Sequence, residues 1–217
     1  MNKKRLNVVI LAIAAALVMS AMAASAASAG TFKAESYPAT IKGEQSSQLL
    51  FTGVVGTWKC TKLAMAGELA AESGSLTLAP QYEGCSWAGQ AATISMNGCT
   101  YKFTAGETVE GKETKVKGTM DVVCPAGKEM VLVLNGGTCT IRIAAQTNLN
   151  SVTLETAGAP TDVSLVFNVA GITYKVENGM IPCPNSPANG TYTNGALLGT
   201  ETLQAEVSGK TVGFKVV

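Results

Sequence analysis

The chain has 217 residues, of which 16 are basic and 15 acidic, and it contains no histidine. Without histidine, the usual Ser-His-Asp and Cys-His nucleophile systems are excluded, and so are most catalytic zinc and copper sites. The two aspartates, Asp121 and Asp162, are too few for a D-x-D-x-D calcium loop. We therefore expect no metal, no cofactor and no enzymatic activity.

The first 29 residues contain the three parts of a secretory signal peptide. The chain begins with the basic run Lys3-Lys4-Arg5, continues with apolar residues 6–22, and reaches the A-x-A sequence Ala27-Ser28-Ala29. Cleavage after Ala26 is the alternative, and a retained membrane anchor is the competing interpretation of the apolar run. We predict a signal helix within 1–29 that engages the export machinery and signal peptidase, and a protein that is secreted or loosely associated with the cell surface.

Residues 30–217 form the predicted exported protein. Three of the 16 basic residues lie in the signal, so this part has 13 basic and 15 acidic residues and a net charge of −2. A slightly acidic surface does not suit nucleic-acid binding. The length fits one medium domain or two small ones. We expect a single domain over 30–217, with a division near 105–118 as the alternative.

Short runs of alternating apolar and polar residues follow residue 30, and no segment has a reliable helical period. Asn-Gly suits the two central positions of a type I′ hairpin turn, because both need positive φ. The dipeptide occurs five times, at Asn97-Gly98, Asn135-Gly136, Asn178-Gly179, Asn189-Gly190 and Asn194-Gly195. This pattern predicts an all-β fold, an antiparallel β-sandwich built of hairpins.

Three segments, 92–103, 131–143 and 164–176, share a weak pattern of strand, Asn with Gly, strand. Each ends with a basic residue between two apolar ones, in Tyr101-Lys102-Phe103, Ile141-Arg142-Ile143 and Tyr174-Lys175-Val176. In a strand this places the basic residue on one face and its neighbours on the other. The alternative is that hairpins of any sandwich resemble each other, and the irregular spacing argues against a solenoid.

Six cysteines in an exported chain predict three disulfides rather than a metal site, since there is neither a C-x-x-C pair nor a histidine. Cysteines in strand-like runs alternate along the chain with cysteines at turns, and two of the gaps are 25 residues long. This order favours the pairs Cys60–Cys85, Cys99–Cys124 and Cys139–Cys183. The alternative keeps the first pair and joins Cys124 to Cys139 and Cys99 to Cys183.

The segment from Thr104 to Gly118 is the most polar part of the chain, with glutamates and lysines alternating with Thr and Val. Charges on exposed strand edges deter pairing with other chains. We therefore expect a protruding hairpin or an edge ribbon here, and the alternative is a hinge between two subdomains.

The aromatic residues are the remaining candidates for a ligand site, because Trp58, Tyr82, Trp87 and Tyr101 each lie within three residues of a cysteine. Exposed rings stack on sugars, and Trp87, in the turn after Cys85, is predicted to be the exposed one. Tyr82 and Trp87 are therefore the speculative ligand-binding residues. The favoured alternative is a tryptophan packed on a disulfide in the core of a sandwich.

Several motifs resemble those of a group of uncharacterised secreted six-cysteine proteins of soil actinobacteria. They are Tyr37-Pro38-Ala39-Thr40-Ile41, Asn97-Gly98-Cys99-Thr100-Tyr101, Val122-Val123-Cys124-Pro125-Ala126-Gly127-Lys128, Gly137-Thr138-Cys139-Thr140-Ile141 and Gly190-Thr191-Tyr192-Thr193-Asn194-Gly195. The resemblance covers nearly all of the exported part. It implies export and a cysteine-linked β fold, but no activity and no site residues.

These observations favour a non-enzymatic secreted or cell-surface protein with a structural or adhesive role. The alternative is a module that binds carbohydrate or another small ligand, with surface glycans or other surface proteins as partners. A third hypothesis is a carboxylate-based hydrolase, which would need two glutamates about 5–10 Å apart in one cleft.

Overall fold

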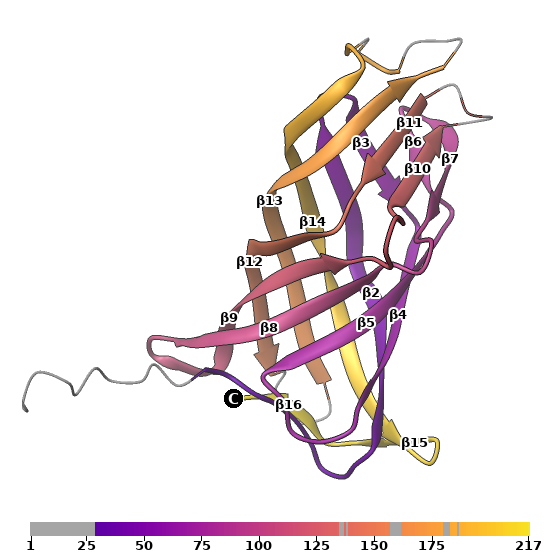
Figure 1. Ribbon diagram of the computed structural model, residues 1–217. Helices are drawn as coiled ribbons and strands as arrows, with labels where there is room; N and C mark the ends of the chain where they lie inside the picture. The colour runs from indigo at the N-terminus through magenta and orange to yellow at the C-terminus, as the bar shows by residue number, and fades with distance from the viewer. Residues whose placement is uncertain (1–28, 135–136, 138, 157–161, 180–182, 186) are drawn as a thin grey trace, which may run out of the picture.

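The computed structural model describes residues 29–134, 137, 139–156, 162–179, 183–185 and 187–217 (Figure 1). The predicted signal helix and the turn at Asn135-Gly136 lie outside these residues. Within them, no helix is long and apolar enough to cross a membrane.

The described chain is built almost entirely of β-strands, which vary from two residues to 18. In chain order the strands are β1 (Phe32–Ala34), β2 (Ala39–Gly53), β3 (Gly56–Cys60), β4 (Lys62–Leu69), β5 (Ser75–Glu83), β6 (Ser86–Trp87), β7 (Gln90–Ser95), β8 (Thr100–Val109), β9 (Lys112–Val123), β10 (Met130–Leu134), β11 (Cys139–Ile143), β12 (Gln146–Thr156), β13 (Asp162–Asn178), β14 (Gly190–Val207), β15 (Lys210–Val212) and β16 (Phe214–Val216). All of their pairings are antiparallel.

The main sheet closes on itself in two circuits. The larger circuit runs β2-β4-β5-β8-β9-β12-β13-β14 and returns to β2. The smaller circuit leaves β2 through β3, β6, β7, β10 and β11 and joins β13. Figure 1 shows the long strands β2, β13 and β14 running through both circuits, with the short strands β3, β6, β7, β10 and β11 gathered at one end.

The interior follows from the period of two along each strand, because alternate side chains point to opposite faces of a sheet. In β10 and β11 every second residue is buried, and the long β13 keeps a similar alternation. The buried residues form one hydrophobic cluster with walls of strands on opposite sides. The predicted all-β, antiparallel, sandwich-like fold is confirmed.

The three predicted disulfides, Cys60–Cys85, Cys99–Cys124 and Cys139–Cys183, are all present. Each links a cysteine in or beside a strand to one outside a strand. The alternative pairing of Cys99 with Cys183 is wrong, because Cys99 is bonded to Cys124 and Cys183 to Cys139.

The Asn-Gly turns behave differently from the prediction. Asn97-Gly98 has the expected positive φ values of 49° and 83°, but it joins β7 to β8, which do not pair with each other. Asn194-Gly195 lies inside β14. The tight hairpins β6–β7 and β14–β15 instead turn at Ala88-Gly89 and Ser208-Gly209, where both φ values are also positive. The position of each tight turn is set by which strands pair, and glycine at the second central residue adopts the required positive φ without steric cost.

The three similar segments fold in three ways. In the segment 131–143, residues 131–134 lie in β10 and 139–143 in β11, which pair with each other. Residues 92–103 cross between the two circuits, and residues 164–176 lie in the single strand β13. The turn predicted in the third segment is wrong, because Gly171 with φ of 76° produces only a bulge. The alternation of each triplet is confirmed, since Lys102, Arg142 and Lys175 lie between buried neighbours.

The polar segment 105–118 forms the end of the β8–β9 hairpin, which projects at one side in Figure 1. The predicted protruding hairpin is observed, because the pairing of β8 with β5 ends at Thr104 and the pairing of β9 with β12 begins at Lys115, which leaves the tip of the hairpin without neighbouring strands from these two partners.

Candidate functional site

The predicted exposed tryptophan is buried. Trp87 is 1 % exposed, and its ring centroid lies 4.5 Å from that of Trp58, the residue that faces it across β3 and β6. Its Nε1 donates a hydrogen bond of 2.8 Å to the carbonyl oxygen of Val55. The exposure predicted for Trp87 is wrong because the tight turn at Ala88-Gly89 makes it a strand residue facing inward. The core role is the one observed.

Tyr82 also points into the interior. Its hydroxyl lies 2.6 Å from the hydroxyl of Tyr101, and burial raises the pKa of Tyr101 to about 12. Tyr82, Tyr101 and Trp58 line an apolar cavity of about 30 Å³. Ligand pockets are usually about 300–1,000 Å³, so this cavity is a packing defect of the core. Tyr82 and Trp87 therefore do not form the predicted stacking surface.

Changing Trp87 to Phe is expected to cost more stability than changing Trp58 to Phe. Both rings are 1 % exposed, but among the described residues only the Trp87 indole has a hydrogen-bond partner. Trp87→Phe leaves the buried Val55 carbonyl unpaired, which costs about 1–3 kcal/mol. Urea unfolding of both variants measures the difference, and equal losses would contradict a role for this hydrogen bond.

Among the described residues, Glu201 is the only ionisable acidic or basic side chain that is fully buried. It lies in β14, beside Gln45 of β2, and neither carboxyl oxygen has a hydrogen-bond partner. Burial, together with the nearby charge of Glu44, raises the pKa of Glu201 to about 8. The carboxyl is therefore mostly protonated at neutral pH.

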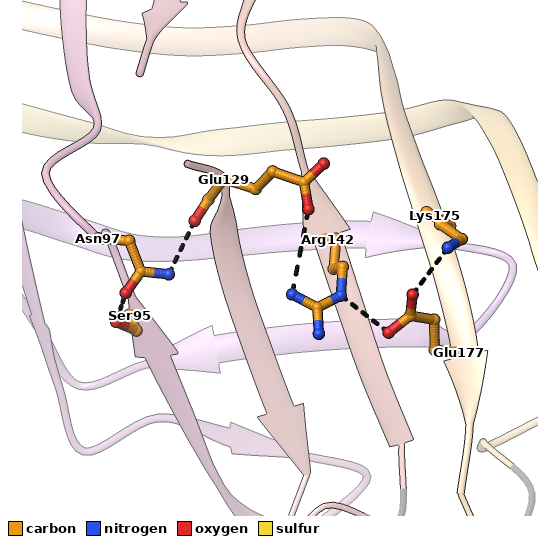
Figure 2. A network of polar contacts seen from close by, with 6 residues as sticks. All are labelled: Ser95, Asn97, Glu129, Arg142, Lys175 and Glu177. Carbon is orange, nitrogen blue, oxygen red and sulfur yellow. Dashed lines mark hydrogen bonds and ion pairs between the residues drawn. The ribbon is translucent and has the colours of Figure 1, made fainter. Parts of the chain in front are cut away.

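A polar network covers the outer face of the smaller circuit, as Figure 2 shows for Ser95, Asn97, Glu129, Arg142, Lys175 and Glu177. Glu177 accepts hydrogen bonds of 2.8 Å from both Lys175 and Arg142. These two bonds lower the pKa of Glu177. Arg142 also lies 4.0 Å from Glu129. The carboxylates are thus engaged with cations, and exposed pairs of this kind contribute about 0–1 kcal/mol each.

A groove on the outer surface of the larger circuit begins at a bulge in β8. The strands β8 and β9 pair at Ala105 with Gly118 and next at Thr108 with Val116, so β8 contains one extra residue between these pairs. A bulge bends its strand and redirects side chains. Here it turns the backbone of β8 away from regular pairing with β9.

A second bulge lies on the other side of β9. The strands β12 and β9 pair at Leu149 with Met120 and at Val152 with Gly118, which leaves one extra residue in β12. Ser151 in this bulge has φ of 73°, a conformation that is strained for a residue other than glycine. The two bulges therefore flank β9 at the same height.

The floor of this bulge groove contains two glycines where the strands approach closely. A Cβ on Gly106 would lie 2.8 Å from the carbonyl oxygen of Lys117, and one on Gly118 would lie 2.7 Å from that of Thr104. The groove has a volume of about 730 Å³. Its lining residues are Thr104, Gly106, Glu107, Lys117, Gly118, Thr119, Asn150, Ser151, Val152, Thr153 and Asn168.

The polar side chains of the bulge groove have no partners within the described part of the chain. Eight of the lining side chains are polar, and none of them makes a hydrogen bond or an ion pair there. Glu107 is the single carboxylate and Lys117 the single cation among them. The groove thus offers unpaired hydroxyl, amide and charged groups on a frame of paired strands.

Sequence reasoning singled out half of this groove. The polar segment 104–118 supplies its β8 and β9 side, although the expected role there was edge protection. The other side, at Asn150, Ser151, Thr153 and Asn168, was missed. The available signal was the run Asn148-Leu149-Asn150-Ser151, in which the alternation of β12 breaks down.

Comparison of the chain with protein-family models, with curated proteins and with solved structures found no match in any of the three. The resemblance to the secreted six-cysteine proteins therefore stays a prediction.

Proposed function

We propose that the chain is an exported, non-enzymatic protein with a structural or adhesive role, released or held loosely at the cell surface. The observation that carries this proposal is the set of three disulfides within one chain. Structural disulfides form and persist in oxidising compartments outside the cytoplasm. The signal-like sequence of residues 1–29 agrees with that location.

The arrangement of carboxylates supports a role without catalysis. A glycosidase uses two carboxyl groups on either side of the bond that breaks, whereas the bulge groove contains Glu107 alone. Glu129 and Glu177 flank Arg142 and are held by cations. The closure of the two circuits supports a scaffold role, since the strands within them have partners on both sides and do not offer free edges along which chains aggregate.

Cell fractionation tests this proposal. The full chain with a carboxy-terminal tag is expressed in a bacterial host, and cytoplasm, membranes, surface wash and medium are compared. We expect the protein in the wash and the medium, beginning at residue 30, with the mass of a chain that has three disulfides. Accumulation in the cytoplasm with free thiols would refute it.

The bulge groove favours binding of a polar ligand as a second role. Such binding is compatible with adhesion, because surface glycans are among the expected partners.

A further inference from the structure

We propose that the bulge groove binds a neutral, polyhydroxylated ligand, a short stretch of a surface polysaccharide. This proposal rests on the adhesive role above and assigns it a site. The groove volume of about 730 Å³ lies within the usual range of ligand sites.

The groups that line the groove match the chemistry of a sugar. A sugar hydroxyl both donates and accepts hydrogen bonds, and so do the hydroxyl and amide side chains of proteins. Six neutral side chains of these two kinds line the groove, namely Thr104, Thr119, Asn150, Ser151, Thr153 and Asn168. None has a partner within the described residues, so each is available to a ligand.

The charges of the groove favour a neutral ligand over an ionic one. Glu107 and Lys117 both line it and do not pair with each other. An anionic polymer would meet the Glu107 carboxylate, and a cationic one would meet the Lys117 ammonium. Because the two charges are opposite, neither an anionic nor a cationic ligand gains net electrostatic binding energy. Sugar hydroxyl groups, in contrast, can form hydrogen bonds with both side chains.

The frame of the groove suits recognition by hydrogen bonds. Its walls belong to β8, β9, β12 and β13, which pair with one another in this order, so the polar groups are held by strands rather than by loops. A site that is already ordered loses little freedom on binding. No aromatic ring lines the groove, and water competes for every hydrogen bond. We therefore expect weak binding, about millimolar for one site, that becomes useful on a surface with many repeats.

The test titrates the purified full chain, with its disulfides formed, against maltohexaose, cellohexaose, chitohexaose and mannohexaose, with polygalacturonate as an anionic polymer. We expect at least one neutral oligosaccharide to bind. The double variant Asn150→Ala/Asn168→Ala should weaken that binding about tenfold, because two hydrogen-bonding side chains are lost. The control Thr93→Ala changes an exposed residue of β7 outside the groove and should leave the affinity unchanged.

The variant Asn168→Leu provides a second measurement, because an apolar side chain at this exposed position adds no aromatic ring, offers no hydrogen bond to a sugar and should weaken binding. The proposal is overturned if no neutral oligosaccharide binds, if polygalacturonate binds better than every neutral one, or if the groove variants bind as the parent does. Export and surface association without sugar binding would leave the proposed function standing and remove this site. Sugar binding by a protein that stays in the cytoplasm would do the reverse.

Discussion

At about pH 9 the Glu201→Gln variant is expected to be more stable than the parent protein by a few kcal/mol, whereas below about pH 4 the two should differ little. Glu201 is fully buried, and its pKa rises from 4.5 to about 8, mainly through burial. Below both values the carboxyl is protonated in the folded and unfolded states. Between them only the unfolded state ionises, so stability falls by about 1.4 kcal/mol for each pH unit. Above about pH 8 the full loss is reached.

Urea unfolding of the parent and the variant across this pH range measures the effect. The control Glu68→Gln makes the same chemical change at an exposed position of β4 and should leave the pH slope intact. Glu44→Gln should reduce the loss at high pH, because the Glu44 charge helps to raise the pKa of Glu201. A variant Glu201→Gln with the slope of the parent would show that another group causes it.

Removing the Cys139–Cys183 disulfide, as Cys139→Ala/Cys183→Ala, is expected to cost about 4 kcal/mol of stability in the chain-entropy model. The bond closes a segment with a sequence separation of 44 residues, and both cysteines are nearly inaccessible. It also ties β11 to the segment after β13, beside the pairing that closes the smaller circuit. Breaking it should therefore loosen this closure as well as enlarge the freedom of the unfolded chain.

The matched control is Cys99→Ala/Cys124→Ala, whose bond has a sequence separation of 25 residues. Its expected cost is smaller, about 3.5 kcal/mol. Urea unfolding gives the two free energies, and amide hydrogen exchange locates the change. Unaltered protection of β10 and β11 in the Cys139–Cys183 variant would argue against its role in holding the smaller circuit.

Much of the fold could be predicted from local patterns, because the period of two along strands and the spacing of the cysteines can be read from short stretches of sequence. The triplet Tyr174-Lys175-Val176 shows this, since its alternation alone predicts which side chains are buried. The pair Cys99–Cys124 is a second case. Cys99 comes directly before β8 and Cys124 directly after β9, so the two cysteines lie side by side at the open end of one β-hairpin.

The candidate site could not be predicted to the same extent, because it depends on register. A bulge is a mismatch between two strands, and the extra residues near Glu107 and Ser151 are defined only by what faces them on β9. The exposure of Trp87 could not be predicted for a similar reason. Its position close to a turn favours exposure, whereas in the structure it lies in β6 directly opposite Trp58 of β3.

The sequence by itself thus determined an all-β chain with six cysteines, because alternation is encoded locally, and it favoured the pairing that the structure contains over one alternative. Only the tertiary structure decided that the sheet closes twice through β2, β13 and β14, and that two bulges meet at β9. These features arise from pairing between residues far apart in the chain. The free energy of such pairing depends on packing across the whole core, which no local pattern contains.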